Sequence, residues 1–171
     1  MTEKRPVFDP TVQGNIPQFP SEEWFKETLG EDYRQLVSQQ LYSVGLLDEG
    51  EDLKLDPVKN DNQVDDRHFL YEGVIKGNFV SVCLLKDDGY AATSVNPNSE
   101  TDIYLLKGSL VLTLYYWESG EKDEFIELTE DNNHFRIEPD VHFMVHSGII
   151  DSKDLAFYIE VTPISDDQTS F

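Results

Sequence analysis

Four histidines are the side chains in this sequence best suited to proton transfer, because imidazole titrates near neutral pH. They are His68, His134, His142 and His146. His142 and His146 stand four residues apart in an apolar run, and strand side chains alternate in direction with a period of two. Both are therefore expected on one face of a strand, where either can act as a general acid or base. For each, the alternative is a histidine whose bonds are satisfied within the fold.

The other two histidines stand at the ends of expected elements. His134 follows a turn-forming stretch, 131–133, and is expected at a rim. His68 begins the first β-like run. Cys83 is the only cysteine, so no disulfide forms within the chain, and its apolar neighbours indicate a buried side chain rather than a nucleophile.

Carboxylates offer a second kind of chemistry. His142 and His146 with one acid, Glu100 or Glu160, are a possible set of metal ligands, which we rank below a site without metal. Paired acids elsewhere are sequence neighbours in loops and do not form the opposed carboxylates that glycoside hydrolysis needs. Nothing resembles a phosphate-binding glycine loop, a zinc-finger spacing or a serine nucleophile elbow.

Length and charge exclude several classes of function. The chain has 171 residues, which suits one domain, and its formal net charge is 13 − 34 = −21. This charge disfavours nucleic acid and anionic membranes as partners, because both need a cationic surface. No apolar stretch approaches the roughly 18 residues of a membrane span, and the N-terminus lacks an apolar signal segment. We therefore expect a cytoplasmic protein.

Composition divides the chain into five segments. They are an irregular N-terminal arm (1–20), helices that pack on the main body (21–45), an acidic loop (46–67), a β region (68–163) and a C-terminal tail (164–171). In the helical segment, a serine followed by two glutamates marks a helix start. Tyr33, Leu36, Val37 and Leu41 then recur at the spacing of one helical face.

The β region is a series of short β-branched and aromatic runs. They span 68–75, 79–85, 103–106, 109–117, 125–128, 134–137, 143–145 and 155–162. Stretches rich in Gly, Asn and Asp separate them, as tight turns require. Short strands at this spacing, with no helices between them, indicate an antiparallel sandwich or barrel.

Two glycines and a proline in this region fall into the register of a known pair of motifs. Gly89 and Gly108 match the glycines of G-x5-H-x-H-x3-E-x6-G, and Pro139 matches the proline of G-x5-P-x-G-x2-H-x3-N. These are the motifs of the cupin family, which the β region resembles. The resemblance implies a mainly β fold, a cupin-like antiparallel β-barrel or jelly roll with one or two N-terminal helices. It also suggests a homodimer.

The metal-ligand positions of the first motif are replaced in this sequence. They fall on Val95, Pro97 and Thr101, none of which is a good ligand for a first-row metal. We therefore expect a metal-independent site with no cofactor. A small barrel can hold one small ligand in its mouth. The expected substrate-binding residues are the three replaced positions together with Ile103 and Met144.

The second motif bears on the direction of the histidines. Strict spacing places the motif's histidine at Met144, and a shortened turn places it at His142. Both alignments direct residues 142, 144 and 146 into the cavity. In the last run, Phe157, Ile159 and Val161 share a face, and Tyr158 and Glu160 share the opposite one. We expect the latter near solvent or at a subunit contact.

Three functions remain open from the sequence. The preferred one is binding of a small organic molecule in the barrel, with an enzymatic form in which His142 or His146 acts as acid or base in an isomerase, epimerase or lyase. The second is a non-catalytic scaffold or protein-interaction module that uses the acidic segment. The third is a metal-dependent cupin dioxygenase.

Overall fold

The computed structural model describes residues 22–53, 56–57, 68–85, 90–93, 99–115, 123–139, 141–147 and 155–164. The expected N-terminal arm, most of the acidic loop beyond residue 53 and nearly all of the tail lie outside this range. Two helices come first, α1 (Glu22–Leu29) and α2 (Tyr33–Ser43). The strands follow: β1 (Asp56–Pro57), β2 (His68–Ile75), β3 (Asn78–Leu85), β4 (Tyr90–Thr93), β5 (Thr101–Gly108), β6 (Leu110–Tyr115), β7 (Glu124–Leu128), β8 (His134–Ile137), β9 (His142–Ser147) and β10 (Ala156–Pro163).

The strands form two antiparallel sheets. One has six strands in the order β1-β2-β3-β10-β5-β8, and the other has four in the order β4-β9-β6-β7. The C-terminal strand β10 lies in the middle of the six-stranded sheet, between β3 and β5. The fold is therefore mainly β with two N-terminal helices, as the sequence predicted.

Local turn chemistry explains where several strands end. Lys76 and Gly77, between β2 and β3, both have positive φ (+48° and +79°), which is the pattern of a two-residue hairpin turn. Between β7 and β8, the backbone groups of Thr129 and Asn132 bond each other in both directions (3.1 and 3.2 Å). Both turns lie where the sequence predicted them. The short strands β1 and β4 were not predicted.

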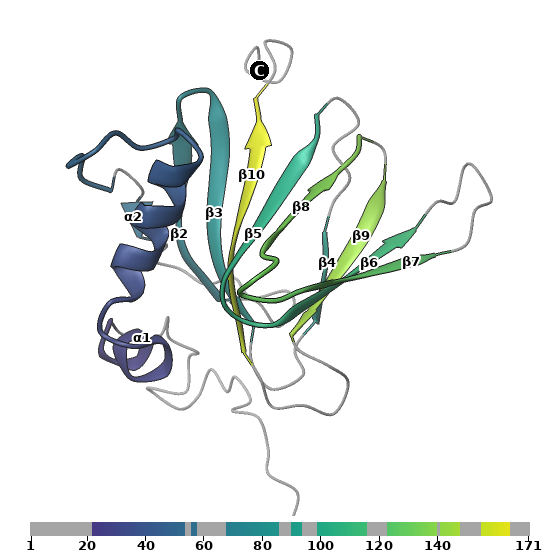
Figure 1. Ribbon diagram of the computed structural model, residues 1–171, viewed down its shortest axis with the longest axis horizontal. Coiled ribbons are helices and arrows are strands. Elements are labelled where there is room, and N and C mark those ends of the chain that lie inside the picture. The colour runs from purple at the N-terminus through teal and green to yellow at the C-terminus, as the bar shows by residue number, and fades with distance from the viewer. Residues whose placement is uncertain are drawn as a thin grey trace, which may run out of the picture.

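The central strands of the six-stranded sheet are buried on both faces. One core cluster packs α1 and α2 against it and includes Val37, Val82 and Ile159. The other fills the space between the two sheets and includes Leu112, Val145 and Tyr158. Figure 1 shows the two helices on the outer side of this sheet, away from the four-stranded sheet.

Helix α2 packs through the face that its sequence spacing predicted. Tyr33, Val37 and Leu41 are buried, and Leu36 is half-buried beside them. The helix begins after Gly30 and ends before Gly45, and both glycines have positive φ. Among the described residues, no helix has the length and apolar character needed to cross a membrane.

The two sheets converge at one end and diverge at the other (Figure 1). At the closed end, β5 leads through Ser109 into β6, and the Ser109 amide donates to the Leu155 carbonyl (3.1 Å). At the opposite end, β5 and β9 begin and β6 and β10 finish, as their antiparallel pairing requires. We call this second end the open end.

Gly108 at the closed end provides a test of this architecture. Its φ is +90°, and a Cβ there would collide with the carbonyl group of Leu155, whose carbon lies 2.8 Å away. Left-handed backbone costs an L-residue about 1–2 kcal/mol, and overpacking costs about 1–3 kcal/mol. We expect Gly108→Ala to lower the free energy of unfolding by about 2–5 kcal/mol, measured by urea denaturation.

Gly77→Ala is the matched control, because Gly77 has a similar φ (+79°) but no atom within 4 Å of its Cβ position. It should lose only the backbone cost of about 1–2 kcal/mol. Equal losses for the two variants would contradict a tight closed end.

Candidate functional site

The inward face of the six-stranded sheet can be identified from its core residues. Cys83 of β3, Ile103 of β5 and Tyr158 of β10 belong to the core shared by the two sheets. Because strand side chains alternate with a period of two, residues two positions away share this face. Ser81, two residues before Cys83, and Glu160, two residues after Tyr158, therefore face the interior toward the open end.

These inward positions form two rows across neighbouring strands. The first places Glu72, Ser81 and Glu160 opposite one another on β2, β3 and β10. The second places Val74 opposite Phe79 and Phe79 opposite Thr162. The Oγ1 atoms of Thr162 and Thr101 lie 3.2 Å apart, so a hydrogen bond joins β10 to β5 in this row. These two rows therefore carry two carboxylates (Glu72 and Glu160) and three hydroxyls (Ser81, Thr101 and Thr162) at the open end.

Burial differs along the two rows. Ser81 and Thr101 are only 5% and 8% exposed. Glu160 is half-buried, and its Oε1 atom has almost no accessible surface. At the margin, Val74 and Phe79 are 60% and 41% exposed. Ser81, Thr101 and one oxygen of Glu160 are therefore buried below this apolar margin, whereas the Glu72 side chain is exposed.

The four-stranded sheet provides the opposite, apolar wall. Leu114 of β6 and Phe143 of β9 are paired neighbours near the open end, and both are buried in the shared core. The site thus combines one wall of carboxylate and hydroxyl groups with one apolar wall. Such an arrangement can bind an organic molecule, orient it through hydrogen bonds and exchange a proton with it at a carboxylate.

The structure corrects the predicted direction of β9. Residues 142, 144 and 146 do share a face, but the face turned into the core is that of Phe143, Val145 and Ser147. His142, Met144 and His146 lie on the outer face of the four-stranded sheet. The reason is hydrophobic burial, which favours phenylalanine and valine over histidine in the space between the sheets. The catalytic role predicted for His142 and His146 assumed that both face the interior, and in the structure they do not.

The expected direction of β10 was also wrong. Phe157, Ile159 and Val161 do share a face, but it packs against the helices, which leaves Tyr158 and Glu160 facing the interior. Tyr158 is fully buried. The sequence carried a signal for this, because helices predicted to pack on the barrel need an apolar sheet face.

The remaining predicted site residues divide into two groups. Thr101 and Ile103 face the interior, as expected. Val95 and Pro97, like Gly89, lie outside the described residues. Of the three replaced metal-ligand positions, the structure therefore describes only Thr101, whose hydroxyl bonds that of Thr162. A neutral hydroxyl is a weak metal ligand, so the described residues of the motif do not fit a first-row metal.

A second polar cluster lies on the outer face of the six-stranded sheet, where β5 pairs with the edge strand β8. The nearly buried Asp102 carboxylate bonds the His134 Nε2 atom (2.7 Å) and accepts two hydrogen bonds from Arg136 (2.9 and 3.3 Å). Arg136 also pairs with Glu100 (3.2 Å). Tyr104 stacks on the His134 ring, with centroids 4.6 Å apart. The His134 side chain is 41% exposed on this face.

The acids of the predicted metal set are separated in the fold. Glu100 pairs with Arg136 on the outer side of one sheet, whereas His142 and His146 lie on the outer side of the other. Glu160 faces the space between the sheets. Within the described ranges, no three His, Cys, Asp or Glu side chains are grouped so that they could hold a metal ion.

Among known proteins, only solved structures resemble this chain in the comparisons made. No protein-family model matches the sequence, and no curated protein matches it. The structure is similar to the capsular polysaccharide assembling protein CapF from Staphylococcus aureus (TM-score 0.50, 11% identity over 70% of this chain). It is also similar to recombinant oxalate oxidase in complex with glycolate (0.52, 15%, 66%) and to oxalate decarboxylase (0.50, 10%, 64%).

These similar structures are cupin-fold proteins, so the fold of this chain is cupin-like. At such low identities the likeness shows the fold alone. The chain spans 33% of the CapF chain, 58% of the oxalate oxidase chain and 28% of the oxalate decarboxylase chain.

The direction of β9 can be tested with two adjacent substitutions. Phe143 is 3% exposed and packs between the sheets. Phe143→Ala should therefore cost about 3–5 kcal/mol of unfolding free energy. His142→Ala, on the outer face, should cost about 1 kcal/mol or less. Denaturant titration measures both, and a larger loss at His142 would reverse the assignment of faces.

The outer cluster makes a prediction about pH. Burial, and next to it the Asp102 carboxylate, raise the pKa of the Tyr104 phenol above its usual value near 10, while Arg136 lowers it by less. The stability that this phenol contributes is complete below about pH 10 and is lost as pH rises through the higher folded-state pKa. Unfolding free energy should therefore fall more steeply above about pH 10 in the wild type than in Tyr104→Phe.

Asp102→Asn should lower the pKa of Tyr104, because it removes a nearby negative charge. Following the ring carbon beside the phenol oxygen by NMR reports this value directly. An unchanged or higher pKa in that variant would show that Asp102 does not act on Tyr104.

Proposed function

We propose that this chain binds a small organic molecule between its two sheets at the open end. The observation that carries the proposal is the Glu160 carboxylate, which faces the interior with its Oε1 atom buried. Ser81 lies opposite it on β3, and the bonded pair of Thr101 and Thr162 lies in the adjacent row. Buried polar groups are costly to the fold, so their collection at one place in an apolar interior favours a ligand-binding role.

The chemistry of the two walls defines the ligand. Its apolar part would lie against Leu114 and Phe143, and a hydrogen-bond donor would meet the Glu160 carboxylate. Oxalate and glycolate, named for two similar structures, are a poor fit. Among the inward side chains described at this end, Glu72 and Glu160 are acidic and none is a lysine or arginine. A neutral or amine-bearing molecule is therefore favoured over a carboxylate.

In an enzymatic form, Glu160 takes the acid–base role that the sequence suggested for His142 and His146. A carboxylate can remove a proton from a carbon beside a carbonyl and return it to carbon, as isomerisation and epimerisation require. In an elimination it would instead give the proton to the group that leaves the neighbouring carbon. The hydroxyls of Ser81 and Thr101 would then donate to the developing oxyanion. The similar enzymes of known structure support the capacity of this fold for catalysis, not this reaction.

Glu160→Gln tests the proposal with little change in shape. Neutral and amine-bearing metabolites are screened by thermal shift on the wild type, and hits are titrated by calorimetry. A hydrogen bond to a charged group is worth about 1.5–3 kcal/mol, so Glu160→Gln should weaken binding of a hit by roughly 10- to 150-fold.

Glu127→Gln is the matched control, because Glu127 is exposed on the outer face of the four-stranded sheet, opposite Val111. It should leave affinity unchanged, as should a double His142→Ala/His146→Ala variant. Binding that survives Glu160→Gln but is lost in the double histidine variant would place the site on the outer face and refute the proposal. Circular dichroism of each variant checks that the fold persists.

A further inference from the structure

A separate pocket lies on the other side of the six-stranded sheet, between α2 and the strand β5. Its volume is about 260 Å³. Its walls are formed by Leu36, Gln39, Gln40 and Ser43 of α2, Leu105 and Leu106 of β5, and Glu130 and Asn133 of the β7–β8 turn. The volume lies below the roughly 300 Å³ at which pockets for drug-sized ligands begin, so it suits a smaller molecule.

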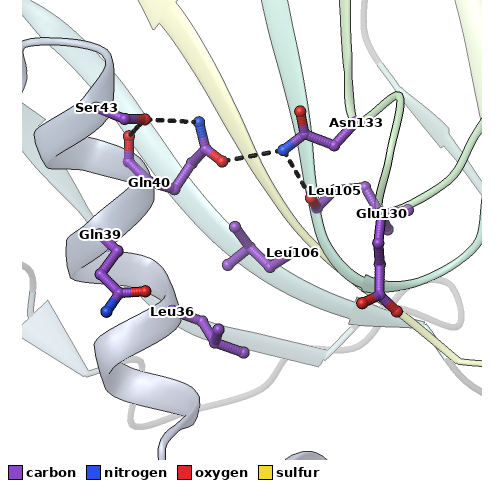
Figure 2. Close-up of a pocket in the computed structure, with 8 residues that line it drawn as sticks. All are labelled: Leu36, Gln39, Gln40, Ser43, Leu105, Leu106, Glu130 and Asn133. Atoms are coloured by element: carbon purple, nitrogen blue, oxygen red, sulfur yellow. Dashed lines mark hydrogen bonds between the residues drawn. The ribbon is translucent and has the colours of Figure 1, made fainter.

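Hydrogen bonds hold the upper wall of the pocket in place (Figure 2). The Asn133 Nδ2 group donates both to Gln40 Oε1 and to the Leu105 carbonyl, at 3.0 Å each. The Gln40 Nε2 group in turn donates to Ser43 Oγ (3.2 Å). Because both Asn133 amide protons are used, the orientation of this amide is determined before any ligand arrives, and its Oδ1 atom remains an acceptor.

The lower walls combine an acid, an amide and apolar groups. Glu130 Oε2 accepts a hydrogen bond from the Gly108 amide (3.0 Å), which holds the carboxylate beside the pocket and leaves Oε1 as an acceptor. Gln39 lies across from it on α2, and Figure 2 shows Leu36 and Leu106 between these two polar side chains. Both leucines are half-buried.

The lining chemistry selects a ligand class. The eight residues include three side-chain amides, one hydroxyl and one carboxylate, and no cation. Amides donate and accept, and a carboxylate accepts, so a suitable ligand carries several groups that do both. The single negative charge and the lack of a cation among the lining residues disfavour anions. The half-buried side chains of Leu36 and Leu106 favour a ligand that also has a C–H face.

We propose that this pocket binds a neutral polyhydroxylated molecule of monosaccharide size. Its hydroxyls would donate to Glu130 and exchange hydrogen bonds with the amides of Gln39 and Gln40, while its C–H face lies on Leu36 and Leu106. The pocket is separated from Glu160 by the six-stranded sheet, so the inference does not depend on the proposed function of the interior.

Nuclear magnetic resonance tests this directly on the whole chain. Glucose, galactose and mannose are titrated separately while the side-chain amide signals of Gln39, Gln40 and Asn133 are followed. At least one hexose should shift all three saturably. Glucuronate should bind at least several-fold more weakly at low salt, because its carboxylate meets Glu130. Gln39→Trp, at an exposed helix position, should fill the pocket and weaken hexose binding at least tenfold.

Gln35→Trp is the control, one helical turn earlier at another exposed position outside the pocket lining. It should change hexose affinity less than twofold. The inference is overturned if none of the three hexoses shifts these amides. Binding unaffected by Gln39→Trp would overturn the location, and glucuronate binding as tight as hexose binding would overturn the ligand class.

Discussion

The central part of the six-stranded sheet is buried on both faces, and this constraint organises the rest of the molecule. Helices cover one face and the four-stranded sheet covers the other. Each of its central strands must therefore supply apolar side chains at most positions, as β3 does, where residues 80–85 are all buried and Ser81 interrupts the apolar run. A polar side chain in such a strand needs an explanation, because burying a polar group costs free energy unless it forms hydrogen bonds. Glu160 and Ser81 are two such residues, and both point the same way.

Buried polar side chains occur at two places on the six-stranded sheet. Asp102 is held by partners on its own sheet, since His134 and Arg136 on β8 both bond its carboxylate. That network joins an edge strand to its neighbour and has a structural explanation within the fold. Glu160, Ser81 and Thr101 lie at the end where the sheets diverge, which is where we propose that a ligand binds.

The cupin-like fold could be predicted from the sequence. Strands β2 and β8 have the predicted boundaries, and the hairpin turns occur where glycine and asparagine allow positive φ or tight bonding. Strand β1 was missed because it has two residues, too few for alternation to be visible. Strand β4 was missed because two of its four residues are alanine, which is depleted in strands. The helix face of α2 was also predictable, because a spacing of three and four residues has one geometrical meaning.

The sequence by itself determined which residues share a face, because alternation with a period of two is a local property of any strand. From the sequence alone, His142 and His146 share one face of a strand, and so do Tyr158 and Glu160. Only the tertiary structure decided which of the two faces is inward, because that depends on what packs on each side. The helices pack against the apolar face of β10, so Glu160 on its other face points between the sheets. In β9, Phe143 and Val145 pack in the core, so His142 and His146 lie on the outer face. The pocket beside α2 likewise depends on the tertiary structure, because Gln40 of α2 and Asn133 before β8 are distant in sequence and form a hydrogen bond there.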